Sequence, residues 1–185
     1  QDNQVYVCLK QGKTALGIAV ASTEKPSSTD TLPVKMADGY VWKFMYSLSG
    51  STSAKFLSAN FIPVAKINDS SGSPLLTTTE QEQAQIQEAA SSKQVIGLAL
   101  TGQGNGYTSA PTVTIVGNGS GASASATVSG GRVVDITLDS SVDSTLTFGY
   151  GYDYASVSIT GGGGTGATAR AILSSDSGIG ANAIA

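Results

Sequence analysis

Histidine is absent from the 185 residues of this chain, and cysteine occurs once. Without histidine the chain lacks the most frequent general base, the usual partner of a serine or cysteine nucleophile, and the most frequent metal ligand. The single cysteine, Cys8, excludes an internal disulfide and a cysteine-rich zinc site, and its apolar neighbours indicate a small strand residue. We therefore predict no catalytic residue, no metal site and no cofactor, and we expect that the protein is not an enzyme.

Charged residues are also scarce. They make up 12% of the chain, and the net charge is −3 with a pI near 4.7. A surface that binds the phosphates of nucleic acid is basic, so we expect no nucleic-acid partner. The chain has no run of about 18 apolar residues, so we expect no membrane span, and its first residues lack the layout of a signal peptide. Because the sequence begins at Gln1 rather than at a methionine, targeting stays open.

Aromatic residues make up 6% of the chain, whereas glycine occurs 23 times. With a hydrophobic fraction of 40%, this composition is too apolar for disorder and too rich in glycine for long helices. Residues 38–48 begin with an Asp-Gly turn and then alternate. Alternation places Tyr40, Trp42, Phe44, Tyr46 and Leu48 on one face of a strand, and Val41, Lys43, Met45 and Ser47 on the other. We predict a half-buried strand whose aromatic face is core rather than contact surface.

Other segments of the first half give further local predictions. Residues 4–10 alternate and predict a strand, and residues 53–57 predict one helical turn. Residues 15–21 and 60–67 predict extended structure, the second at a sheet edge because Pro63 has no amide donor. Residues 68–73 have the composition of a linker.

One helix is predicted near residues 79–91. Thr79 and Glu82 have the spacing of a capping box, in which the hydroxyl accepts from a free amide and the carboxylate reaches back to the cap. The residues that follow have good helix propensity but a narrow apolar stripe. We therefore expect a short, mostly exposed helix that rests on Ile86 and its alanines.

From Val95 onward the chain repeats itself after 45 residues. Gly-x-Gly-Tyr turns at 104–107 and 149–152 match, as do the small-residue stretches at 120–126 and 165–171. Short alternating strands are predicted at 96–100, 112–116, 134–138 and 157–159. Two copies are too few for a solenoid, so we expect them to pack on each other as a small β-sandwich or barrel of about six strands. Tyr107 and Tyr152 would then occupy equivalent corners.

Two glycine-rich segments, 102–106 and 161–166, superficially resemble phosphate-binding loops. Such a loop lies between a strand and a helix, whereas these segments lie between predicted strands with no Lys-Ser or Lys-Thr after them, so we interpret them as turns. Four aspartates are candidate calcium ligands: Asp135, Asp139, Asp143 and Asp153. Their spacing lacks the dense pattern of a calcium loop, which favours solvated acidic turns.

The second Gly-Tyr turn contains Tyr150, Tyr152 and Tyr154. Exposed rings at these positions would form a platform on which a sugar stacks. Alternatively, the ring of a Gly-Tyr turn covers a corner of its own domain. Both readings stay open.

Three segments carry a resemblance to a known family. The segments are Val-Tyr-Val-Cys-Leu at 5–9, Asp-Gly-Tyr-Val-Trp-Lys-Phe-Met-Tyr at 38–46 and Phe-Ile-Pro-Val at 61–64. Together they resemble the small baseplate wedge subunit of T-even-type contractile-tailed phages. The glycine-rich segment 177–185 is similar to one that returns to the same domain in cyanophage-like relatives. The Gly-Tyr repeats are similar to insertions in marine phage structural proteins.

This resemblance implies the domain organisation. Residues 1–70 plus 176–185 would form one interrupted wedge-like β domain, and residues 71–175 would form an inserted module that contains the helix and the repeats. The expected fold class is mainly β, with an inserted small β-sandwich or barrel made of two similar strand-turn-strand repeats.

The resemblance also implies a function without catalytic residues. We expect a structural virion protein of the baseplate, assembled in the host cytoplasm, which links other baseplate wedge proteins and forms a homodimer; its interface residues are unknown. An alternative is a receptor-binding or glycan-binding module of a tail fibre, which predicts exposed rings at Tyr107 and Tyr152. A third class, a glycan-cleaving enzyme, would have to work with carboxylates alone.

Overall fold

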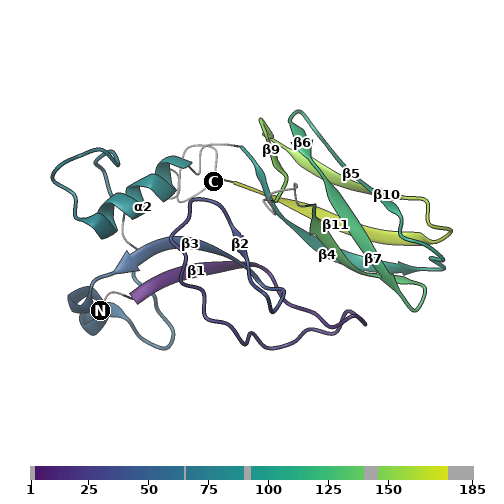
Figure 1. Ribbon diagram of the computed structural model, residues 1–185, viewed down its shortest axis with the longest axis horizontal. Helices are drawn as coiled ribbons and strands as arrows, with labels where there is room; N and C mark the ends of the chain where they lie inside the picture. Colours follow the sequence, from purple (N-terminus) through teal and green to yellow (C-terminus); the bar gives the residue numbers. More distant parts are fainter. Residues whose placement is uncertain (1–2, 65, 90–92, 140–145, 175–185) are drawn as a thin grey trace.

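The computed structural model describes residues 3–64, 66–89, 93–139 and 146–174. The chain builds two β structures that lie end to end in an elongated molecule (Figure 1). The amino-terminal half forms a small sheet with two helices, and the carboxy-terminal half forms a barrel. The predicted mainly β fold class with a small β barrel is therefore confirmed.

The small sheet is built around the aromatic strand. It contains β1 (Asn3–Lys10), β2 (Val34–Lys35) and β3 (Val41–Leu48), all antiparallel in the order β1-β3-β2. The predicted Asp-Gly turn precedes β3, with Gly39 at φ +84°, a conformation that glycine adopts without steric cost. Tyr40 stacks on Trp42 with ring centres 5.6 Å apart, as expected for residues on the same face of a strand.

The prediction that β3 is buried on one face is wrong. Tyr40 and Phe44 are buried as expected, but Val41 and Lys43 on the opposite face are buried too. The reason is tertiary: the Nζ of Lys43 donates a hydrogen bond to the carbonyl oxygen of Thr31 at 2.7 Å, so the loop before β2 lies over that face.

Two segments predicted to be extended are not strands. Among their described residues, 15–21 and 60–67 contribute to no ladder, and each takes part in one isolated bridge, Lys13 with Ala19 and Ser58 with Phe61. In the first segment, Gly17 at φ +77° turns the chain back on itself. In the second, Pro63 offers no amide for a ladder.

Both helices belong with the small sheet. α1 (Gly50–Phe56) follows β3 and includes all but the last residue of the helical turn predicted at 53–57. α2 (Thr78–Ala89) buries Gln83, Ala84 and Ile86, and it packs on β3. The domain prediction places this helix in the inserted module 71–175, but the helix contacts the amino-terminal sheet. Residues 176–185 lie outside the described residues.

The capping box of α2 lies two residues earlier than predicted. The Thr77 amide donates to the Glu80 carboxylate at 2.8 Å, and the Glu80 amide donates to the Thr77 hydroxyl at 3.4 Å. The predicted pair, Thr79 and Glu82, has the same spacing but lies inside the helix. Residues 77–82 contain two threonine-glutamate pairs with this spacing, so the spacing alone could not show which pair forms the capping box.

The barrel contains the remaining eight strands. They are β4 (Val95–Asn105), β5 (Thr112–Gly117), β6 (Ser120–Ala122), β7 (Ala124–Ser129), β8 (Arg132–Leu138), β9 (Phe148–Tyr150), β10 (Ala155–Thr160) and β11 (Thr165–Leu173). Six form one sheet in the order β4-β11-β10-β5-β7-β8, and β6 pairs with β9. The two ends of the order, β4 and β8, lie against each other, so the sheet is nearly closed.

The two sequence copies are arranged around an approximate two-fold axis. β5 and β10 are equivalent strands and pair antiparallel, which places such an axis between them. The flanking pairs repeat as well. Ser120 lies opposite Tyr150 in β6 and β9, and 45 residues away Thr165 lies opposite Asn105 in β11 and β4. The expectation that the copies pack on each other is confirmed.

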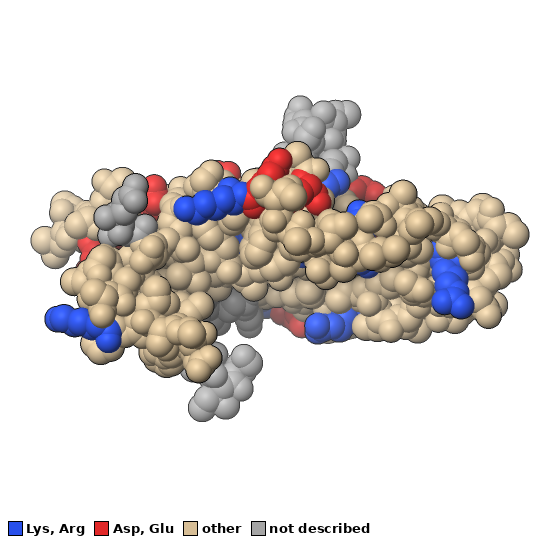
Figure 2. Space-filling model, turned by 90° about the horizontal axis from the view of Figure 1, so that it is seen from below, with Lys and Arg blue, Asp and Glu red and all other residues tan. Residues whose placement is uncertain are grey.

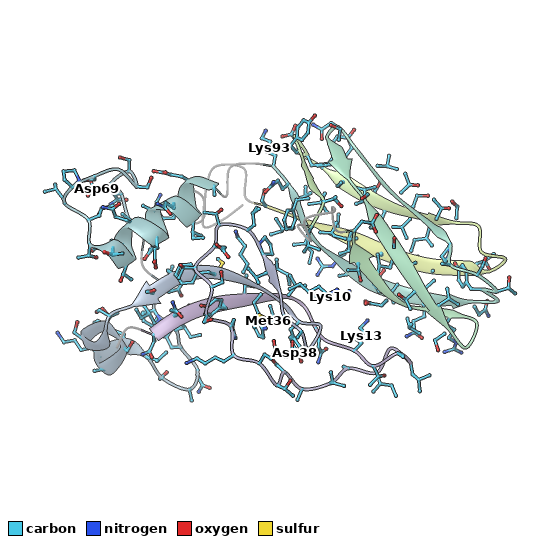
Figure 3. The ribbon with its side chains drawn as sticks, in the orientation of Figure 1. Lys10, Lys13, Met36, Asp38, Asp69 and Lys93 are labelled. Atoms are coloured by element: carbon cyan, nitrogen blue, oxygen red, sulfur yellow. The ribbon has the colours of Figure 1, made fainter. Side chains whose placement is uncertain are left out.

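The ends of the barrel sheet meet without a ladder between them among the described residues. Here the amino-terminal sheet closes the seam. The Nζ of Lys13 donates to the carbonyl of Val134 at 3.1 Å and the Nζ of Lys10 to that of Ile136 at 3.3 Å, both on β8. Both lysines also approach Asp135, at 3.8 Å and 2.7 Å respectively. Figure 3 shows Lys10 and Lys13 between the two β structures, where they cap carbonyls of a strand edge.

Candidate interaction surfaces

Tyr107 and Tyr152, the tyrosines of the two Gly-Tyr turns, are 5% and 3% exposed. The expectation that these rings are exposed is therefore wrong, and the reading in which each ring covers a corner of its own domain applies to them. The reason lies in the opposite copy: a methyl group on Gly164 would lie 2.5 Å from the Tyr107 ring, and one on Gly119 would lie 2.5 Å from the Tyr152 ring. Each ring thus packs directly against the backbone of a glycine.

Backbone hydrogen bonds hold both tyrosines in equivalent places. The Tyr107 amide donates to the carbonyl of Gly131 at 3.0 Å, and the Tyr152 amide donates to that of Lys93 at 2.8 Å. Lys93 has φ +50° and Gly131 has φ +74°, so a lysine holds a left-handed position that its counterpart fills with glycine. The Tyr107 hydroxyl also accepts from the Ala167 amide at 3.3 Å.

Two other tyrosines of the second turn are exposed. Tyr150 is 68% and Tyr154 is 64% exposed, and they flank the buried Tyr152 in the chain. The side chain of Asn118 lies at the same corner: its Nδ2 donates to the Asp153 carboxylate at 2.5 Å, and its Oδ1 accepts from the Asp153 amide at 2.9 Å. This corner combines exposed rings with polar groups held in fixed positions.

The predicted acidic turns do not come together. Asp135 pairs with the seam lysines, Asp139 accepts from Ser125 at 2.6 Å, and Asp153 pairs with Lys93. Asp143 lies outside the described residues. Among the described residues, no group of three histidine, cysteine or acidic side chains is arranged as a metal site.

The two glycine-rich segments are structural parts of the barrel. Gly102 and Gly104 lie inside β4, and segment 161–166 links β10 to β11 and contributes the first two residues of β11. A methyl group on Gly104 would lie 2.4 Å from the Thr165 carbonyl oxygen, so close strand approach explains that glycine. Both segments adjoin strands rather than a helix, as the sequence interpretation expects.

Five large apolar side chains are exposed within residues 56–64, a segment that begins at the last residue of α1. These are Phe56, Leu57, Phe61, Ile62 and Val64, between 43% and 78% exposed, and we call them the apolar loop. Reciprocal hydrogen bonds between Ser58 and Phe61, at 3.0 and 3.4 Å, hold part of the loop. The loop lies at the end of the molecule opposite the barrel (Figure 1).

Two hollows involve the amino-terminal half, and the first of them also involves the barrel. One, of about 350 Å³, is lined by residues 30–35 together with Leu146 and Phe148. The other, of about 380 Å³, lies between the starts of α1 and α2 and is lined largely by hydroxyl groups. Neither gathers residues for acid-base or nucleophilic work.

Cys8 lies on β1 as predicted but is exposed. Partial burial nevertheless raises the pKa of its thiol. The sulfur donates a hydrogen bond to the Lys10 carbonyl oxygen at 3.2 Å. A raised pKa leaves little of the reactive thiolate at neutral pH.

Neither of the described helices is long and apolar enough to cross a membrane. No protein-family model, no curated protein and no solved structure matches this chain.

Proposed function

We propose that this protein is a non-enzymatic structural subunit of a phage virion, a baseplate wedge component that links neighbouring tail proteins by protein contacts. The observation that carries the proposal is the apolar loop. Five exposed apolar side chains lie within nine residues. Exposing so many apolar groups to water is unfavourable for an isolated chain, and such patches mark protein-protein contact sites.

The face of the molecule that Figure 2 shows supports the same function. In Figure 2 the charged side chains form separate small groups on a largely uncharged face. Interfaces of lasting assemblies are poor in charge at their centres. The wedge assignment itself rests on the sequence resemblance at residues 5–9, 38–46 and 61–64, and Phe61 and Ile62 of the apolar loop belong to the third of these segments.

The location of the protein is tested with an antibody raised against this chain and gold-labelled on purified phage particles that carry its gene. Gold at the tail end close to the tube axis is the expected result. Gold at the fibre tips would favour a receptor-binding protein, and unlabelled particles would refute a virion function.

The role of the apolar loop is tested with Phe61→Ser combined with Ile62→Ser. Both side chains are more than half exposed, so we expect a folded protein with unchanged melting temperature that fails to enter assembled tails. Leu75→Ser is the matched control, because Leu75 is 84% exposed but lies outside the loop. Normal incorporation of the double variant would contradict a contact at this loop.

A further inference from the structure

The two copies of the barrel repeat act as an internal comparison. Residues that the corner backbone needs are the same in both: Gly104 and Gly149 have φ +60° and +63°, and Gly106 and Gly151 have φ +77° and +75°. A buried tyrosine follows in each copy. What differs between the corners is therefore not demanded by the shared backbone.

The differences are concentrated on the surface of the second corner. Where the first copy has Asn105 and Ser109, the second has Tyr150 and Tyr154, and all four are exposed. The first corner forms the same turn without the two rings, so packing does not account for them. Two large aromatic side chains left in water at one corner indicate a binding surface.

The polar groups of this corner differ in the same way. Asn118 contacts Asp153, while the equivalent positions at the first corner are Gly163 and Thr108. The side-chain Oδ1 of Asn118 also accepts from the backbone amide of Tyr154 at 3.4 Å, which ties this polar pair to the backbone of the second exposed tyrosine. Hydrogen bonds from Lys93 and Asn118 hold the pKa of Asp153 below its usual range, so the carboxylate stays ionised and accepts hydrogen bonds.

We propose that the second Gly-Tyr corner, formed by Tyr150, Tyr154, Asn118 and Asp153, is a binding site for a neutral glycan. One face of a pyranose ring carries C–H groups, which suit the negative face of an aromatic ring. Its hydroxyls donate to carboxylate oxygens and accept from side-chain amide N–H groups. Here two exposed rings flank Asp153 in the chain, and the Asp153 carboxylate is hydrogen-bonded to Asn118. The apolar loop, by contrast, presents hydrophobic groups in succession and better fits a protein.

The charges of the corner select for neutral sugars. Asp153 repels an acidic sugar, and Lys93, which Figure 3 shows at the end of the barrel near β9, pairs with that carboxylate. This site lies on the barrel, away from the apolar loop, and goes beyond the structural role proposed above.

The test uses the full chain on a printed array of neutral oligosaccharides built from hexoses and N-acetylhexosamines. The variant is Tyr150→Asn with Tyr154→Ser, which gives the second corner the residues of the first. We expect the wild-type protein to retain at least one oligosaccharide and the variant to bind it at least tenfold more weakly. The matched control, Asn105→Ala with Ser109→Ala at the first corner, keeps full binding.

Three outcomes would overturn the proposal. The first is an array on which the wild-type protein retains nothing, and the second is equal retention by the variant and the wild type. The third is a variant with a clearly lowered melting temperature, because the rings would then be structural. If the array is blank and the variant also fails to enter particles, the corner is a protein contact instead. Asp153→Asn, which keeps the side-chain shape, is expected to weaken glycan binding without a change in melting temperature.

Discussion

Tyr107 and Tyr152 are each buried against glycines of the other copy of the repeat. Tyr107 lies on Gly162 and Gly164, and Tyr152 lies on Gly117 and Gly119. Because each copy completes the core of its counterpart, the two copies cannot be separated without exposing both rings. The barrel is thus expected to unfold as one cooperative unit.

Tyr107→Ala and Tyr152→Ala are each expected to lower the free energy of unfolding by about 3–5 kcal/mol, as for other large aromatic side chains removed from a core. Urea denaturation of the purified variants measures the loss. Tyr154→Ala is the control, since its exposed ring should contribute within about 0.5 kcal/mol. A large difference between the two buried sites would argue against their equivalence.

Gly164→Ala is expected to be strongly destabilising. The added methyl group would lie 2.5 Å from both the Asn105 carbonyl oxygen and the Tyr107 ring, and backbone cannot yield as a flexible side chain does. The expected loss is about 1–3 kcal/mol, as for an overpacked core. Gly72→Ala, whose methyl group meets nothing within 4 Å, is the control in the same thermal melts. Equal melting temperatures for the two variants would show that the tyrosine tolerates a shift.

Asp135→Asn is expected to weaken the seam between the two β structures. Lys10 is 16% exposed at its side chain, and burial lowers its pKa while the Asp135 carboxylate opposes that shift. Without the carboxylate, a partly buried ammonium loses its counterion, at a cost of about 1–3 kcal/mol. Urea denaturation at pH 7 measures this loss, and Asp69→Asn in an exposed loop is the control. An unchanged midpoint would mean that the backbone carbonyls alone hold the lysines.

Lys43 should make the stability of the protein depend on pH. Burial lowers the pKa of its ammonium below the ordinary value of 10.5, so between the lowered pKa and 10.5 the unfolded chain binds more protons than the folded one. The contribution of Lys43 to stability therefore rises with pH across that window and is lost as the pH falls through the lowered pKa.

Lys43→Met removes this contribution while keeping the buried stem. We expect the free energy of unfolding to rise less between pH 7 and pH 10 in this variant than in the wild-type protein. The exposed Lys55→Met variant should follow the wild-type curve. Identical pH profiles for the wild type and Lys43→Met would show that the ammonium is well solvated.

The expected homodimer, the wedge partners and the division of the chain at residue 70 stay predictions. The resemblance that suggests them covers about the first third of the chain, and the described structure is that of a single chain. Particle labelling and the loop variants described above bear on the partners.

Local sequence patterns were sufficient to locate most of the longer strands and the repeat. Period-two alternation located β3, β5, β8 and β10, because side chains of a strand point to opposite faces whatever the strand pairs with. The match between the Gly-x-Gly-Tyr turns predicted equivalent corners, because glycine at left-handed positions is a local requirement. Strand alternation and turn geometry depend on neighbouring residues, so both can be predicted from the sequence.

Which side chains meet depends on the tertiary packing. Alternation assigned Lys43 to a solvent face, but a loop from elsewhere in the chain covers it. Spacing could not tell the buried Tyr152 from the exposed Tyr154, since burial depends on glycines of the other copy, more than 30 residues away. The same holds for Lys10 and Asp135, which are brought together by the docking of two sheets. Contacts between distant segments depend on how whole elements pack, and no local pattern records that packing.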